Sequence, residues 1–248
     1  MKSEGKSSRP WTRAELILAI SLYCKTPFGR MHMRNPDIIA LAEEIDRTPG
    51  SISYKLANLA SIDESIHQKG AANASRLDRE VWIEFFEHPN IMALVNEAYF
   101  TAINTPITAV TPSIDDVVRP GLTKNSVVKI RTNQDFFRRM ILTSYNNVCC
   151  ITGIGSTELL NASHIIPWAH NTKTRMNPTN GLCLNALHDR AFDRGLLSID
   201  DAYKVIIADK VKHPLLRQYH GQPIHLPERF IPDQRFLSYH REHIFIDR

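Results

Sequence analysis

The residues best suited to chemistry lie between Ser163 and Asp193. His164 stands in an apolar run, and an imidazole titrates near neutral pH, so it is able to take a proton from water. His188 and Asp193 follow on a segment with a helical pattern, where they lie on neighbouring faces and can converge on one ion. A general base beside a divalent ion is suited to phosphodiester hydrolysis, because the ion stabilises negative charge on the phosphate and the leaving oxygen.

Each of these residues also has a simpler interpretation. A single histidine in an apolar strand is more often a core residue whose hydrogen bonds are satisfied, and His188 by itself would be a helix-surface residue. Asp193 is able to pair locally with Arg190 or Arg194. The chemical interpretation therefore depends on the residues acting as a set.

Short strands and helices have to hold this set in place. The pattern predicts a strand over 159–168, a polar loop, and then a strand or turn that leads into a helix over 181–195. The flanking elements that we expect are a helix over 134–145, a short strand and turn over 147–153, a hairpin over 196–209 and a tail over 223–245 that ends in a short helix.

Four spaced motifs resemble the HNH nuclease family, and more narrowly its restriction-type subfamily. They are C-x-T-G at 150–153, S-H-I-x-P-W at 163–168, N-P-x-N-G-L at 177–182 and H-D-x-x-F-D-R-G at 188–195. The resemblance extends from Arg131 to Phe245, about half of the chain. It implies a ββα-metal nuclease module that needs Mg²⁺, Mn²⁺ or another divalent ion and acts on double-stranded DNA.

The resemblance also implies a role for each site residue. His164 is the expected general base. Asn180 is the motif asparagine, which either orders the loop or contacts the metal. His188 and Asp193 are the expected metal ligands on the helix, and all of these residues form the expected catalytic and metal site.

One position departs from the family pattern. Many HNH nucleases have an Asp or His metal ligand immediately before the base, whereas this chain has Ser163. Either Ser163 and water complete the coordination, as magnesium tolerates, or another residue such as Asp189 substitutes. The alternatives to a DNA endonuclease are a non-enzymatic DNA-binding regulator with a degenerate HNH fold, and a nuclease acting on RNA or modified DNA. Cleavage of both DNA strands would need a homodimer or two successive nicks.

The N-terminal half has the spacing of a helical bundle. We expect helices over 12–24, 36–45, 51–62 and 77–88, and the helix–turn–helix spacing of the second and third resembles helix-turn-helix and Myb-like DNA-binding domains. The helix over 50–62 would then enter the major groove. Its expected outward residues are Ser51, Ser53, Tyr54, Lys55 and Asn58, and its expected inward residues are Ile38, Leu41, Ile45, Ile52, Leu56 and Leu59. A purely structural or dimerising bundle is the alternative.

The overall prediction is an α+β protein with a helical domain over 1–90, a linker over 91–129 and a nuclease domain over 130–248. A further short helix is expected over 90–100. Lys173 and Arg175 lie in the polar loop of the nuclease domain, where they either face solvent or contact DNA phosphates.

Composition is consistent with this assignment but does not establish it. The formal net charge is +4, a mild basic excess that suits a polyanionic partner. No segment is apolar and long enough to span a membrane and the N-terminus has no apolar signal core, so we expect a cytoplasmic protein. The four cysteines form no C-x-x-C pair, which argues against a four-cysteine zinc site and favours reduced, buried thiols. A structural metal at Cys149, Cys150 and Cys183 is the less favoured alternative.

Overall fold

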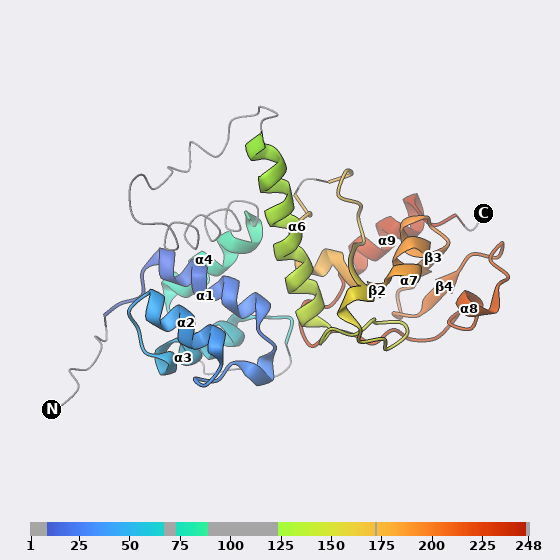
Figure 1. Ribbon diagram of the computed structural model, residues 1–248. Helices are drawn as coiled ribbons and strands as arrows, with labels where there is room; N and C mark the ends of the chain where they lie inside the picture. Colours follow the sequence, from blue (N-terminus) through green and yellow to red (C-terminus); the bar gives the residue numbers. More distant parts are fainter. Residues whose placement is uncertain (1–8, 67–72, 89–123, 172, 247–248) are drawn as a thin grey trace. The chain divides into compact units, whose positions relative to one another are not determined.

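The chain divides into two compact units, Met1–Phe136 and Phe137–Arg248. A computed structural model describes residues 9–66, 73–88, 124–171 and 173–246 (Figure 1). The first unit is helical, and the second combines helices with two small sheets, so the predicted α+β class is confirmed. The helix expected over 90–100 and most of the predicted linker lie outside the described residues.

Four α-helices of the helical unit pack around one apolar core. They are α1 (Arg13–Lys25), α2 (Pro36–Glu44), α3 (Pro49–Ile62) and α4 (Arg76–Glu87). All six side chains expected to point inward from the second and third helices are buried. Spacing alone therefore identified the packed faces of α2 and α3.

Capping residues set the starts of these helices. Thr12 and Glu15 form the expected capping box of α1, and Asn35 caps α2 with Pro36 in the first turn. The start of α3 differs from the prediction, because the Thr48 side chain accepts from the Ser51 backbone N–H and the helix begins at Pro49. Ser51 therefore lies inside the first turn of α3.

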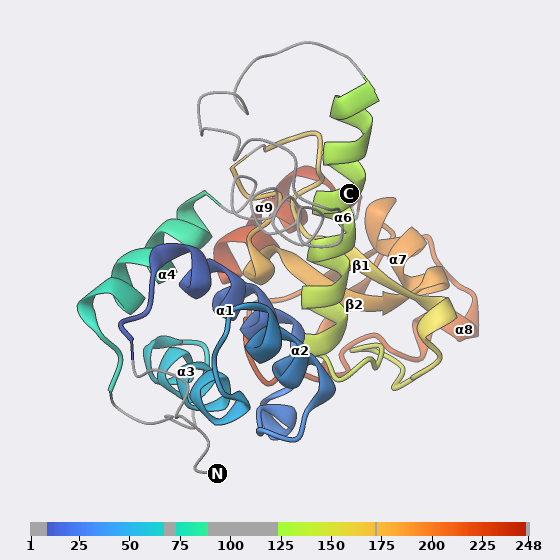
Figure 2. The ribbon, with the colours of Figure 1, turned by 60° about the vertical axis from the view of Figure 1, so that its left-hand side comes forward.

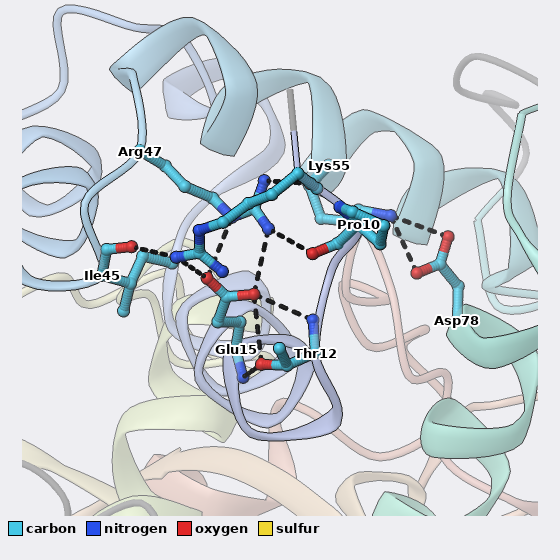
Figure 3. A network of polar contacts seen from close by, with 8 residues as sticks. Pro10, Thr12, Glu15, Ile45, Arg47, Lys55 and Asp78 are labelled. Atoms are coloured by element: carbon cyan, nitrogen blue, oxygen red, sulfur yellow. Dashed lines mark hydrogen bonds and ion pairs between the residues drawn. The ribbon is translucent and has the colours of Figure 1, made fainter. Parts of the chain in front are cut away.

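A buried ionic network ties the segment before α1 to the bundle (Figure 3). Arg47 donates to both carboxylate oxygens of Glu15 at 3.0 Å and to the backbone carbonyls of Arg9 and Pro10. Its guanidinium also lies 4.1 Å from the ring centroid of Trp11. Burial by itself would raise the pKa of Glu15, but hydrogen bonds from Arg47, the Thr12 N–H and Arg9 lower it to about 2.

Two of the residues expected on the outward face of α3 are buried instead. The Lys55 ammonium donates to both oxygens of Asp78 on α4, at 2.8 and 2.9 Å, and the Asp78 side chain is fully buried. Asn58 is only 4% exposed. The outward-facing prediction for Lys55 and Asn58 is therefore wrong, because α4 covers this side of α3. Ser51, Ser53 and Tyr54 keep partly or largely exposed side chains.

The second unit is built on an antiparallel hairpin. Strand β1 (Leu160–His164) pairs with β2 (Gly181–Asn185), and α7 (Ala186–Asp193) follows β2 directly. The hairpin runs along the C-terminal part of α6 (Lys124–Ser144) in both views (Figures 1 and 2). This strand–loop–strand–helix order agrees with the prediction for 159–195. The helix α6 begins inside the predicted linker.

The expected second hairpin is also present, as β3 (Leu197–Ile199) paired with β4 (Val205–Ile207). The short helix α8 (Pro214–Arg217) was not expected, and the terminal helix α9 (Gln234–His243) was. Of the short strand and turn expected over 147–153, only the turn is present. The chain reverses at Gly153, which has a φ of +75° and donates to the Cys149 carbonyl, so extended pairing cannot continue.

The C-terminal helix packs on the end of α7 through His240. This side chain is 1% exposed and stacks on Phe192, with 3.7 Å between ring centroids. Its two ring nitrogens contact the Phe192 carbonyl and the Ser198 hydroxyl, and burial lowers the pKa of His240 to about 4. Nearby, Gly195 has a φ of +64° and its carbonyl accepts from the Ile246 N–H, so a side chain here would collide with the backbone of Ile244.

No described helix is long and apolar enough to cross a membrane. All four cysteines are buried free thiols.

Replacing Lys55 with alanine tests the importance of the buried ion pair. Lys55→Ala leaves the Asp78 carboxylate buried without its partner, so the free energy of unfolding should fall by about 3–5 kcal/mol. Urea unfolding of the whole chain, followed by tryptophan fluorescence, measures the change. The exposed pair Arg76–Glu80 supplies the control, and Arg76→Ala should leave the unfolding midpoint unchanged. Equal midpoints for Lys55→Ala and the wild type would contradict the prediction.

The Glu15 network should make the helical unit sensitive to acid. Because folding lowers the pKa of Glu15 from 4.5 to about 2, its contribution to stability is complete above pH 4.5 and is lost as the pH falls toward 2. Glu15→Gln should therefore be less stable at neutral pH and lose less stability over this acid range. The test is the slope of the urea unfolding midpoint against pH between pH 4.5 and 2, with Glu80→Gln as the exposed control. If the midpoint of Glu15→Gln falls with pH as steeply as that of the wild type, Glu15 is not the source of the acid sensitivity.

Candidate functional site

The β1–β2 register brings His164 opposite Gly181. A side chain at Gly181 would meet Ile141 Cγ1 at 2.7 Å and Phe137 Cζ at 2.9 Å, so only glycine lets α6 approach the hairpin this closely. Phe137 in turn stacks on the His164 imidazole, with ring centroids 3.9 Å apart and planes inclined by 12°. The glycine of the N-G motif therefore provides the space in which the candidate base is held.

The hydrogen bond made by His164 shows which of its two ring nitrogens carries the proton. Its Nε2 lies 2.9 Å from the Arg175 carbonyl oxygen, which can only accept a hydrogen bond, so Nε2 carries the proton. In the neutral imidazole Nδ1 is then the proton acceptor. Burial lowers the pKa of His164, the hydrogen bond to Arg175 opposes this, and the Arg175 charge lowers it further. The neutral form that a general base requires is favoured.

Asn180 orders the loop between the two strands. It is fully buried, its Oδ1 accepts from the Ile166 N–H at 2.8 Å, and its Nδ2 donates to the carbonyls of Ile166 and Thr174 at 3.3 and 3.2 Å. Of the two roles expected for this residue, the geometry favours loop ordering over metal contact, because both of its polar atoms are already engaged within the protein.

Arg175 has a structural role in the same loop. Its Nε donates to the Trp168 carbonyl at 2.7 Å and its guanidinium lies 4.9 Å from the Trp168 ring centroid. The Trp168 ring also contacts the His164 ring edge-on, with 5.4 Å between the ring centroids. Lys173 is exposed, as either of its two interpretations requires. Arg175 is not a fully solvated side chain, because it contacts Trp168 and its carbonyl oxygen contacts His164.

His188 is oriented by the residue that caps its helix. Asn185 Oδ1 accepts from both the His188 backbone N–H at 3.0 Å and its ring Nδ1 at 2.9 Å. An amide oxygen only accepts, so Nδ1 carries the proton and Nε2 has the lone pair. Nε2 is buried and has no hydrogen-bond partner among the described residues. Burial also lowers the pKa of His188. This nitrogen is suited to a metal ion.

A second buried polar atom without a described partner belongs to Ser163. Its hydroxyl oxygen is buried and makes no hydrogen bond to the part of the chain that the structure describes. Strand alternation places Ser163 on the same face of β1 as Asn161, which donates to Asp189 of α7 at 2.7 Å. The two unsatisfied atoms are therefore found at the two positions where the HNH pattern expects metal ligands.

The structure supports the acidic ligands less directly. Asp193 is exposed, and partial desolvation and the nearby Asp189 carboxylate raise its pKa. In the described part of the chain, no three His, Cys, Asp or Glu side chains converge closely enough to hold a metal ion. Whether Asp193 or Asp189 contributes to the site stays a prediction.

Three positioning residues were not identified from the sequence. Asn185 orients His188, and Thr152 in turn accepts from Asn185 Nδ2 at 3.1 Å, which assigns a role to the C-x-T-G turn. Phe137 stacks on His164. Asn185 carried a detectable signal, since an asparagine directly before a helix is a typical cap. No sequence pattern indicates the stacking of Phe137 on His164, because this contact depends on tertiary packing.

Comparison with known proteins agrees with this geometry. The family model described as HNH endonuclease matches residues 149–200, which span the turn, both strands of the hairpin and α7. The match to this family is therefore confined to the C-terminal unit and to about a fifth of the chain. No curated protein matches the chain.

One similar solved structure is a "Modification dependent TagI restriction endonuclease", at 22% identity and a TM-score of 0.35. The alignment covers 44% of this chain and 37% of that chain, so this chain spans well under half of that protein's length.

Asn180→Ala tests the ordering role of the motif asparagine. The substitution removes three hydrogen bonds and leaves the Ile166 N–H buried without an acceptor, so the free energy of unfolding should fall by about 1–3 kcal/mol. Asn180→Asp keeps an acceptor for Ile166 but loses both Nδ2 bonds. Urea unfolding of the two variants, followed by the fluorescence of Trp168 in a chain whose other tryptophans are replaced by phenylalanine, measures the effect. An alanine variant as stable as the parent would refute the role.

Proposed function

We propose that this protein is a metal-dependent endonuclease that hydrolyses phosphodiester bonds of double-stranded DNA. The observation that carries the proposal is the hydrogen bond from His164 Nε2 to the Arg175 carbonyl within the segment that matches the HNH endonuclease family. This bond leaves Nδ1 as the proton acceptor, as a general base requires. A restriction-type role in defence is the biological setting that the resemblance suggests.

In this proposal His164 Nδ1 takes the proton from the water that attacks phosphorus. Phe137 and Trp168 hold the ring by stacking and edge contact, and the Arg175 carbonyl keeps the proton on the opposite nitrogen. Burial keeps the imidazole neutral before the reaction. Lys173, which is exposed on the same loop, and the outer guanidinium nitrogens of Arg175 would contact DNA phosphates beside the scissile bond.

The residues fit a divalent ion that keeps several water ligands. His188 Nε2 and Ser163 Oγ are buried polar atoms without a described partner, and together they would hold the ion, with Asp193 or Asp189 as the carboxylate ligand. Mg²⁺ and Mn²⁺ suit such a site, because magnesium commonly binds one or two protein oxygens and water. When bound, the ion supplies positive charge for the phosphate and the leaving oxygen. Asn180 supports this site by ordering the loop.

Plasmid cleavage with matched histidine variants tests the proposal. His164→Ala should reduce the cleavage rate by about 10²–10⁴-fold, because it removes the proton acceptor. His188→Ala should raise the Mg²⁺ or Mn²⁺ concentration needed for half-maximal cleavage, because it removes a metal ligand. His225→Ala, an exposed histidine outside the site, is the control and should cleave as the wild type does.

The outcomes separate the proposal from its alternatives. Wild-type cleavage that needs both metal and His164 supports it. Duplex binding without cleavage of unmodified or modified DNA would instead favour a DNA-binding regulator, and the neutral Ser163 would then mark a degenerate site. Cleavage of RNA or of modified DNA alone would keep the reaction and change the substrate.

A further inference from the structure

Five of the nine lysine and arginine side chains in the described residues 9–66 and 73–88 pair with carboxylates of the same unit. Figure 3 shows Arg47 contacting Glu15 and Lys55 paired with Asp78. Arg9 also pairs with Glu15. Arg13 pairs with Glu84, and Arg76 pairs with Glu80. Their cationic groups are already engaged by carboxylates, so they are less available to a polyanion than a cation with no such partner.

The segment between α1 and α2 is different. It contains the short 3-10 helix η1 (Phe28–Arg30) and continues to Asn35, and it exposes Arg30, His32 and Arg34 within five consecutive positions. Within the part of the chain that the structure describes, neither arginine has a carboxylate partner. We call residues 30–34 the basic loop.

The basic loop is held in place by hydrogen bonds. The Ser53 hydroxyl of α3 donates to the Met31 carbonyl at 2.8 Å, and Asn35 Nδ2 donates to the Arg30 carbonyl at 2.8 Å. The Asn35 backbone N–H also donates to the His32 carbonyl at 2.9 Å. The two arginines are therefore anchored next to α3, and ordering them for a ligand costs little further backbone entropy.

The outward face of α3 offers no charge of its own. Its exposed or half-exposed side chains Ser51 and Tyr54 are neutral, and Lys55 is committed to Asp78. Affinity for duplex DNA comes mainly from cationic contacts to phosphates, which neutral side chains cannot supply. A cationic phosphate contact on this side of the bundle therefore has to come from an adjoining segment, and the basic loop adjoins α3 through Ser53.

We propose that the basic loop binds the phosphate backbone of double-stranded DNA through Arg30 and Arg34. The identity of the partner rests on the proposed function, which makes DNA the substrate. Ser53, expected from sequence to contact DNA, acts here by holding the loop. Arginine contacts to phosphates position a protein without reading sequence, so the loop contributes affinity rather than specificity.

Duplex binding by an Arg30→Ala/Arg34→Ala double variant tests the proposal. The full chain is titrated onto a fluorescent duplex in EDTA, where binding is measured without cleavage, over a range of KCl concentrations. Loss of two phosphate contacts should lower the slope of log Kd against log [KCl] by about 2 and weaken binding by about 10-fold. Arg30→Lys/Arg34→Lys keeps the charge and should restore most of the slope.

A control with the same change in charge uses two exposed arginines of α4. Arg76→Ala/Arg79→Ala should bind with the slope of the wild type. An equal loss in the control, an unchanged slope in the loop variant, or no duplex binding by the wild-type chain would each overturn the proposal. Circular dichroism and thermal melting verify that all variants are folded.

Cleavage assays keep this inference separate from the nuclease proposal. A wild-type chain that binds duplex through the basic loop but never cuts it would refute the nuclease and leave the loop assignment intact. If the wild type cuts DNA and the Arg30→Ala/Arg34→Ala variant binds duplex equally well, the loop assignment is refuted and the nuclease proposal stands.

Discussion

The loop between β1 and β2 is held by the side-chain amide of Asn180, and the candidate site depends on that loop. Asn180 lies at the end of the loop, is fully buried, and contacts Ile166 near the start of the loop and Thr174 in its middle. Thr174 precedes Arg175, whose carbonyl oxygen fixes the proton on His164. The amide does no chemistry itself, yet it sets the position of the group that would orient the base. An alanine there would leave buried backbone groups unsatisfied as well as removing the constraint.

The half-buried His164 and the buried His188 and His240 of the C-terminal unit show how hydrogen bonding distinguishes structural from chemical roles. His240 uses both ring nitrogens inside the protein and therefore has no free lone pair for a ligand. His164 and His188 each direct one nitrogen to an oxygen that can only accept, the Arg175 carbonyl and the Asn185 amide oxygen. Each therefore keeps a lone pair on its other nitrogen. Burial favours the neutral form in all three cases.

Basic residues divide in a similar way in the helical unit. Arg47 and Lys55 are buried in ion pairs that connect helices and the segment before α1, and their charge is neutralised there. Arg30 and Arg34 are exposed on a segment whose backbone is anchored by Ser53 and Asn35. An exposed cationic side chain on an anchored backbone is the arrangement expected of a phosphate contact. Buried ion pairs instead hold the elements of the fold together.

The sequence by itself predicted most of the order of elements and the residues of the candidate site. Apolar spacing identified the buried faces of α2 and α3, and the spaced motifs indicated an HNH domain, because both signals are local and periodic. Only the tertiary structure decided which polar atoms are satisfied. It showed that Lys55 and Asn58 face inward, since α4 is distant in sequence and covers them. It also showed that Phe137 and Arg175 hold His164, because side-chain stacking and a carbonyl contact across a loop leave no periodic trace in the chain.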